Sequence, residues 1–150
     1  MSASDLSQIL EPYSLTVTQA VQWGEMDAYL HVNNITYFRY FENARIEYFE
    51  HTGINAYKAE HKIGPILGHT ECKYLAPLTW PEEISIGIRI VALREKRFTM
   101  ENIVYSHKQD KAVAVGTAEI VYFDYDKHCS TVIPDELVEK LKAFEAGKIG

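Results

Sequence analysis

The sequence has few cysteines and no long apolar run, and each absence excludes a class of protein. Its two cysteines, Cys72 and Cys129, stand far apart and show no C-x-x-C spacing, so a framework of disulfide bridges is not expected. No apolar run is long enough to span a bilayer. The first residues also lack the basic and apolar segments of a secretory signal. We therefore expect a cytoplasmic protein with no membrane partner.

Basic residues are in the minority, and several site classes lack their signatures. With 15 Lys and Arg residues against 21 Asp and Glu residues, the net charge is −6, which disfavours a general nucleic-acid-binding surface. The 6 histidines show no H-E-x-x-H pairing, and the chain has no G-x-S-x-G elbow and no phosphate-binding glycine loop. We expect no metal, no cofactor and no nucleic-acid partner.

The chain has 150 residues, of which 47% are hydrophobic and 24% are charged. This length and composition are typical of a single globular domain, which we expect over residues 1–150. Alternation of apolar and polar residues predicts antiparallel strands over residues 14–23, 66–75, 84–93, 98–107 and 112–123. Gln19 alone breaks the alternation of the first strand. We expect a loose lead-in with a short helical turn over residues 1–12, and a loop with at most one helical turn over residues 52–64.

Residues 34–50 carry the longest helical pattern of the chain. Four apolar residues recur on one helical face, and their neighbours widen it until most of the circumference is apolar: Tyr37, Phe41, Ala44 and Tyr48. A polar sector remains that is free to meet water or a partner, formed by Thr36, Arg39, Asn43 and Glu47. Other structure should therefore wrap this helix.

The last predicted strand shows which surface the helix covers. One face of it has only small residues, namely Ala112, Ala114, Gly116 and Ala118. Such a row lets a bulky helix approach closely, so we expect the helix over residues 34–50 to lie across it. A second helix should start near Pro134 and end at Gly147. The predicted class is α+β, in which a long helix and a curved antiparallel sheet bury each other.

Side chains that can carry chemistry gather between the first strand and the long helix. Glu25, Asp27 and His31 fall within a short turn directly before the helix. The first N–H groups of a helix lack internal partners and carry the positive end of its dipole, so this placement suits activation of an electrophile. Taken alone, however, an aspartate near a helix start is most often a turn or capping residue.

The segment from Trp23 to Arg45 resembles the hotdog-fold thioesterases of the 4-hydroxybenzoyl-CoA thioesterase type. The shared pattern is an aromatic-x-D/E-x-D turn, then H-V-N-N, then a Tyr-containing helix with E-x-A-R, which here occupy residues 23–27, 31–34 and 42–45; Y-L-x-P-L follows at residues 74–78. The resemblance covers nearly the whole chain. It implies a five-stranded sheet wrapped round the helix, a homodimer or homotetramer with sheets joined edge to edge, and hydrolysis of an acyl-CoA thioester.

The resemblance also implies roles for the residues of the turn. Asp27 falls on the family's catalytic acid, either as nucleophile or as general base. Backbone N–H groups near Asn34 and Ile35 would polarise the thioester carbonyl. Glu25 is either a second acid or a residue that orients the turn and tunes Asp27. His31 is either an acid-base group or a residue that hydrogen-bonds the turn and orders the helix entrance.

Further residues are expected to position the helix or bind substrate. Asn33 and Asn34 would cap the helix, and Tyr37 would contact the substrate. Arg45 would pair with Glu42 in a structural role. Three basic residues at a predicted hairpin tip could meet the CoA phosphates, although a solvated turn is the commoner meaning of such a cluster: Arg94, Lys96 and Arg97.

Two positions depart from related patterns. Leu30 stands where family members often carry Gly, and Tyr29 stands where plant acyl-carrier-protein thioesterases have Asn. Leu30 suggests a different turn backbone and a narrower pocket. Tyr29 argues against the exact set of site residues found in the plant acyl-carrier-protein thioesterases. The alternatives that stay open are an acyl-carrier-protein thioesterase, another hotdog enzyme such as a dehydratase, and a non-catalytic acyl-CoA-binding protein.

Overall fold

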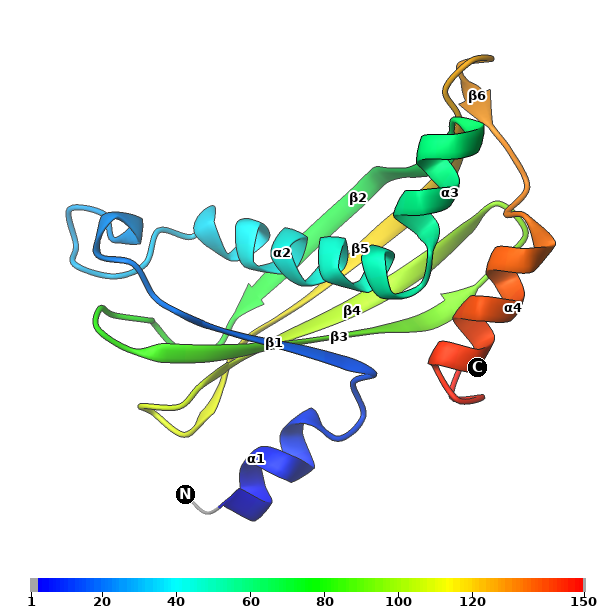
Figure 1. The fold of residues 1–150 in the computed structure, drawn as a ribbon. Helices are drawn as coiled ribbons and strands as arrows, with labels where there is room; N and C mark the ends of the chain where they lie inside the picture. The colour runs from blue at the N-terminus through cyan, green and yellow to red at the C-terminus, as the bar shows by residue number, and fades with distance from the viewer. Residues whose placement is uncertain (1–2, 150) are drawn as a thin grey trace.

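The computed structural model describes residues 3–149, in which a bent antiparallel sheet carries a long helix across one face (Figure 1). In chain order the elements are α1 (Ala3–Leu10), β1 (Leu15–Ala20), the 3-10 turn η1 (Trp23–Glu25), α2 (Thr36–His51), α3 (Ile54–His61), β2 (Ile63–Tyr74), β3 (Glu83–Leu93), β4 (Arg97–Ser106), β5 (Lys111–Asp124), β6 (Cys129–Ser130) and α4 (Asp135–Phe144). The strand order is β1-β3-β4-β5-β2, with β6 paired to β5, and all neighbours are antiparallel. The predicted α+β class, with a five-stranded sheet, a long helix and a C-terminal helix, is confirmed.

Helix α2 packs closely against the sheet. Four isoleucines of β3 belong to the same buried cluster as the aromatic residues of α2 and are at most 1% exposed: Ile84, Ile86, Ile88 and Ile90. Gly116 of β5 leaves room for α2, because a Cβ atom at this position would overlap the ring of Phe41. The expectation that the helix lies across a row of small residues is confirmed.

The packing of α2 also explains the polar residue that interrupts β1. Gln19 Oε1 accepts a hydrogen bond from Asn43 Nδ2 of α2 at 3.2 Å. One member of the predicted polar sector therefore contacts the sheet, whereas Arg39 and Glu47 of the same sector are exposed.

The prediction of a loop over residues 52–64 was wrong, because this segment contains α3. Gly53 and Lys62 flank the helix in left-handed conformations, with φ of 81° and 57°. Ile54 is the one buried residue of α3, so the segment has almost no apolar periodicity by which a helix is recognised. Strand β2 also begins earlier than predicted, at Ile63.

The first predicted strand is shorter than expected, and the lead-in is more helical. Strand β1 ends at Ala20; Val21 and Gln22, expected to continue it, lie outside helices and strands, and Trp23 begins η1. The lead-in forms the 8-residue helix α1 in place of a single turn, and α1 lies apart from α2 (Figure 1). A 3-10 turn depends on local hydrogen bonds, which a pattern of apolar residues does not report.

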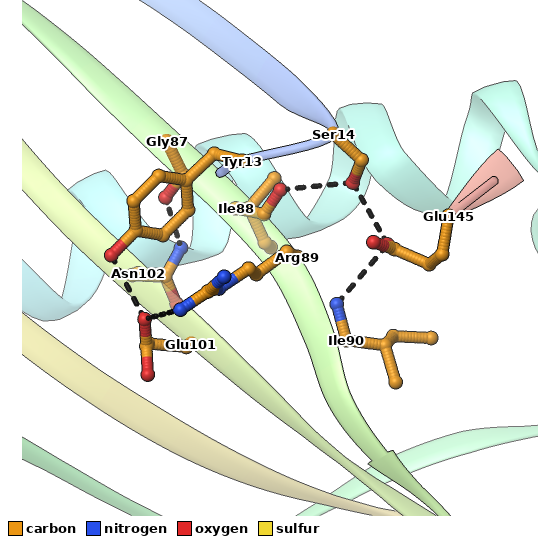
Figure 2. Close-up of polar contacts among 9 residues, drawn as sticks. All are labelled: Tyr13, Ser14, Gly87, Ile88, Arg89, Ile90, Glu101, Asn102 and Glu145. Carbon is orange, nitrogen blue, oxygen red and sulfur yellow. Dashed lines mark hydrogen bonds and ion pairs between the residues drawn. The ribbon is translucent and has the colours of Figure 1, made fainter. Parts of the chain in front are cut away.

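Polar contacts tie both ends of the chain to the sheet (Figure 2). Glu145, just after α4, is 2% exposed. Its Oε2 accepts hydrogen bonds from Ser14 Oγ at 2.8 Å and from the Ile90 N–H at 3.1 Å. The neighbouring Tyr13 donates its hydroxyl to Glu101 Oε1 of β4 at 2.9 Å. The segment before β1 and the end of α4 are therefore held on the central strands.

The turn between β1 and α2 lies at one end of the sheet. The Val21 N–H donates to the Glu82 carbonyl at 2.8 Å, and the Val32 N–H donates to the Leu78 carbonyl at 2.9 Å. These bonds join the turn to the loop that precedes β3. The β3–β4 hairpin and α4 lie at the opposite end (Figure 1). Over residues 3–149, every helix is too short or too polar to cross a membrane.

The contact between Gly116 and Phe41 predicts that any side chain at position 116 destabilises the fold. Gly116→Ala should lower the free energy of unfolding by about 1–3 kcal/mol, because an added methyl group in a tightly packed core forces its neighbours to move. Gly24→Ala is the matched control, since nothing lies within 4 Å of its added Cβ. Urea unfolding followed by circular dichroism measures both variants, and equal stability of the two would contradict the packing described.

Candidate active site

Asp27 is part of a closed turn and keeps one carboxylate oxygen free. Its N–H donates to the His31 carbonyl at 3.0 Å, and its own carbonyl accepts from the Leu30 N–H at 3.0 Å. Asp27 Oδ1 accepts the Tyr29 N–H at 2.8 Å, which is the local bond typical of turn aspartates. Oδ2 accepts no hydrogen bond from another of the residues 3–149. The side chain can therefore hold the turn and still present an oxygen for chemistry.

Leu30 adopts a backbone conformation that glycine favours. Its φ is 63°, within the left-handed region, and its side chain is 69% exposed. A leucine here is compatible with the turn that a glycine would form, so the substitution requires no different backbone. Because the leucine side chain is mostly exposed, it adds an apolar group to the surface of the turn.

Glu25 holds the turn against α2 through one of its carboxylate oxygens. Its Oε1 accepts hydrogen bonds from the Gln22 N–H at 2.7 Å and from the Tyr40 hydroxyl at 2.9 Å. Its carbonyl accepts the Asn33 N–H at 2.9 Å. Burial, followed by the hydrogen bond to Glu25, raises the pKa of Tyr40 well above its usual value, so the phenol stays a donor. These contacts match the orienting role of Glu25.

The start of α2 offers free N–H groups, although not all of the predicted ones. The helix begins at Thr36, and the Ile35 N–H already donates to Asn33 Oδ1 at 3.1 Å. The Thr36 N–H donates to the Asn33 carbonyl at 2.9 Å. Asn33 thus caps the helix start, whereas the N–H groups of Asn34 and Tyr37 find no acceptor in the described part of the chain. The two donors left for a substrate are those of Asn34 and Tyr37.

Tyr74 connects the edge of the sheet to this helix start. Its hydroxyl donates to the Asn34 carbonyl at 2.8 Å, and its ring meets that of Tyr37 edge-on at 5.0 Å. Burial, with a further contribution from Cys72, raises the pKa of both phenols to about 12. Both tyrosines therefore remain protonated at neutral pH. Tyr74 lies 40 residues from Asn34 in the chain, so residue spacing gives no sign of this contact.

An open groove of about 360 Å³ lies at the helix start. Its walls come from the turn, from α2 and from the end of β2 with the loop that follows: His31, Val32, Asn34, Tyr37, Tyr74, Leu75, Ala76 and Pro77. The His31 imidazole makes no hydrogen bond with another described residue, whereas its main-chain carbonyl accepts the Asp27 N–H and closes the turn. Apolar walls with a few polar groups are typical of a small-molecule site.

The predicted basic cluster lies far from this groove. The residues of the β3–β4 hairpin are separated from the turn by the 11-residue strand β3, a span of roughly 36 Å in an extended strand. Arg94 Nη1 pairs with Glu119 Oε1 at 3.2 Å. Within one chain the fold does not bring Arg94, Lys96 and Arg97 to the groove. The predicted pairing of Arg45 with Glu42 is also not formed, because Arg39 Nη1 contacts Glu42 Oε1 at 3.0 Å.

In the part of the chain that the structure describes, no three His, Cys, Asp or Glu side chains gather so as to hold a metal ion.

Comparison with known proteins identifies relatives over most of the chain. The model of the thioesterase-like superfamily matches residues 21–141. A protein of Aquifex aeolicus (strain VF5), provisionally named an esterase, is 33% identical over 124 residues, which are 81% of this chain and 93% of the relative. The long-chain acyl-CoA thioesterase FadM of Escherichia coli (strain K12) is 23% identical over 122 residues, or 81% of this chain and 92% of FadM.

Solved structures share the same fold. A thioesterase from Thermus thermophilus, complexed with coenzyme A and zinc, is 26% identical and superposes with a TM-score of 0.80, over 91% of this chain and 97% of that chain. A thioesterase-superfamily protein from Jannaschia sp. CCS1 has a TM-score of 0.84 at 23% identity, over 96% and 92% of the two chains. The predicted hotdog fold is thereby confirmed.

The left-handed backbone at Leu30 predicts that a glycine at this position is tolerated better than another branched apolar residue. Leu30→Gly should change the free energy of unfolding by less than about 1 kcal/mol, because relief of the left-handed strain offsets the greater entropy of glycine in the unfolded chain. Leu30→Val should lower it by about 1 kcal/mol or more, since β-branched residues strongly disfavour positive φ. Urea unfolding compares the two variants, and a valine variant as stable as the glycine variant would refute this account.

Proposed function

Because the chain belongs to the thioesterase-like superfamily and is a thioester hydrolase with the hotdog fold, we propose that it hydrolyses acyl-CoA to a free acid and coenzyme A. The observation that carries this proposal is the groove at the start of α2, which is lined by Asn34 and Tyr37 and by His31 of the turn; Asp27 belongs to the same turn but is not among the lining residues. An acyl-CoA thioesterase among the relatives and a coenzyme A complex among the similar structures support the choice of substrate.

The thioester carbonyl oxygen would accept hydrogen bonds from the N–H groups of Asn34 and Tyr37. These donors stand at the positive end of the α2 dipole, so they stabilise the negative charge that develops on the oxygen. Asp27, through Oδ2, either attacks the carbonyl carbon or removes a proton from the attacking water. In the general-base route, the proton that Asp27 takes from water passes to the coenzyme A sulfur as the C–S bond breaks. In the nucleophilic route, the C–S bond breaks to give an anhydride of Asp27 with the acyl group and the coenzyme A thiolate; water then hydrolyses the anhydride to the free acid, restores the carboxylate and supplies the proton of the thiol.

The other residues of the turn would support this chemistry without taking part in bond making. Glu25 Oε1 accepts hydrogen bonds from the Gln22 N–H and the Tyr40 hydroxyl, and these bonds would position the turn on α2. His31 lines the groove and is available to contact the substrate. Tyr37 forms part of the same wall.

We propose that the working unit is a homodimer joined through β2. This strand ends the sheet order, and its outer edge of 12 residues has N–H and C=O groups that a second copy could pair. Three of its large apolar side chains are between 41% and 44% exposed: Ile66, Leu67 and Tyr74. The free cysteines, Cys72 and Cys129, suit the reducing cytoplasm in which we expect this dimer to act.

Asp27→Asn should lower kcat for acyl-CoA hydrolysis about 100-fold or more, because the amide can neither attack the carbonyl nor accept a proton. The substitution preserves the Oδ1 contact with the Tyr29 N–H, so the fold should persist. A thiol-release assay over a panel of acyl-CoAs measures the effect. Asp126→Asn, at an exposed turn, is the matched control. Undiminished turnover by folded Asp27→Asn would remove Asp27 from the mechanism.

Tyr74→Phe should lower kcat about 2- to 10-fold with a smaller change in KM, which corresponds to losing one hydrogen bond of about 0.5–1.5 kcal/mol. The hydroxyl holds the Asn34 carbonyl, and the donors of the helix start lose alignment without it. Tyr57→Phe, on α3, is the control. A Tyr74→Phe enzyme with unchanged kcat and raised KM would argue that Tyr74 binds the substrate and does not position the helix.

A further inference from the structure

One wall of the groove belongs to the loop that joins β2 to β3, residues 75–82, which we call the wall loop. Leu75, Ala76 and Pro77 of this loop line the groove. The loop lies at the same end of the sheet as the turn and the β4–β5 hairpin (Figure 1). The width of the groove therefore depends on how this loop is held against its neighbours.

Leu78 joins the wall loop to the turn and to α2. It is 0% exposed, and its carbonyl accepts the Val32 N–H at 2.9 Å. Burial raises the pKa of the Tyr37 phenol, and a hydrogen bond from the Leu78 main chain opposes this rise. Since Val32 and Tyr37 both line the groove, the place of Leu78 sets the distance between the wall loop and these lining residues.

Glu82 closes the wall loop with both oxygens of its carboxylate. Oε2 accepts the Thr79 N–H at 3.0 Å and the Thr79 hydroxyl at 3.4 Å. Oε1 accepts the hydroxyl of Ser106, a fully buried residue at the end of β4. The Glu82 carbonyl accepts the Val21 N–H at 2.8 Å. Glu82 thus binds the wall loop, the sheet and the segment that leads into the turn.

The β4–β5 hairpin completes this set of contacts. Ser106 Oγ accepts the Gln109 N–H at 3.0 Å, and Gln109 Nε2 donates to the Pro77 carbonyl at 2.6 Å. Pro77 and Glu82 are therefore held on the same hairpin, one on each side of Leu78 in the chain. Because its flanks are fixed, Leu78 stays against the turn.

The charge of Glu82 also lies close to α2. Burial is the largest cause that raises the pKa of Tyr37 and of Tyr40, and the negative charge of Glu82 adds to the rise at both. Tyr37 lines the groove, and Tyr40 donates its hydroxyl to Glu25 of the turn. A carboxylate that only closed a local turn would need the Thr79 contacts alone. The contacts of Glu82 with other elements therefore indicate more than a local role.

We propose that Glu82 is a positioning residue for thioester hydrolysis, which holds the wall loop at the distance from the start of α2 that the reacting thioester requires. Glu82 is not among the residues that line the groove, so it acts through Thr79 and Leu78. This inference rests on the proposed function, because it assumes that the thioester reacts at the start of α2. A displaced wall lowers the rate because the reacting atoms lose their alignment.

The contacts of Glu82 require a carboxylate at this position. Both of its oxygens accept hydrogen bonds, whereas a glutamine would turn its NH2 group toward one of the donors. An aspartate keeps two acceptor oxygens on a shorter side chain. The two variants therefore separate the loss of an acceptor from a change in length.

The test measures kcat and KM for the acyl-CoA that the wild type hydrolyses fastest, after circular dichroism has shown that each variant is folded. Glu82→Gln should lower kcat about 10-fold and change KM by less than about twofold, and Glu82→Asp should recover most of that loss. Glu83→Gln, at the exposed neighbouring acid, is the matched control and should leave both constants unchanged. Gln109→Ala, which removes the Pro77 contact, should lower kcat about 2- to 10-fold.

Several results would overturn the inference and leave the proposed function intact. An unchanged kcat of folded Glu82→Gln, with only a lower melting temperature, would show a purely structural role. A raised KM at unchanged kcat would show that the wall loop only binds the substrate. Equal losses in Glu82→Gln and Glu82→Asp would contradict the need for two acceptors. If Glu82→Gln does not fold, Gln109→Ala decides: a lowered kcat at constant KM supports the inference, and an unchanged kcat overturns it.

If the wild type hydrolyses no thioester, the proposed function fails, and nuclear magnetic resonance then tests the positioning alone. The amide N–H signals of Val32, Asn34 and Tyr37 should shift in Glu82→Gln and keep their positions in Glu83→Gln. Signals that stay in place in both variants would overturn the inference.

Discussion

The close contact between Phe41 and Gly116 sets the distance between α2 and the sheet, and the geometry of the site depends on that distance. With α2 pressed onto β5, its first residues come within reach of the edge strand β2. The Tyr74 hydroxyl can then bond the Asn34 carbonyl at 2.8 Å. A helix lying farther from the sheet would break this bond, and it would separate the two walls of the groove. The packing of the core therefore also determines the geometry of the groove.

Two acids of the turn make different contacts. Glu25 Oε1 accepts a backbone N–H and a buried tyrosine hydroxyl and so joins the turn to α2, whereas Asp27 Oδ1 accepts an N–H of the turn itself; the second oxygen of each carboxylate accepts no hydrogen bond from the described residues. Free helix N–H groups lie just beyond them, and the dipole of α2 makes that region favourable for negative charge. The bonds of Glu25 to Gln22 and Tyr40 hold the turn against α2.

Helix α2 serves several tasks along its length because each of its faces meets a different environment. Its core face is aromatic and fully buried, its start faces the groove, and its flank toward β2 contains Arg45. Arg39 pairs with Glu42 on the more exposed part of that flank. A helix wrapped by other structure on most sides can arrange such groups in sequence along one axis.

Sequence alone determined the fold class, the strand order along the chain, the close approach of α2 to a row of small residues, and the turn that contains Asp27. These features depend on short-range periodicity and local motifs. Sequence missed α3, because a helix with one buried residue has little apolar pattern. Only the tertiary structure decided that Tyr74 bonds the Asn34 carbonyl, that Asn33 occupies the Ile35 N–H, that the hairpin cations lie at the far end, and that Glu42 contacts Arg39 and not Arg45. Each of these outcomes depends on which atoms meet across long separations in the chain, or on which of several groups wins one hydrogen-bond or ion-pair partner. Residue spacing encodes neither kind of outcome.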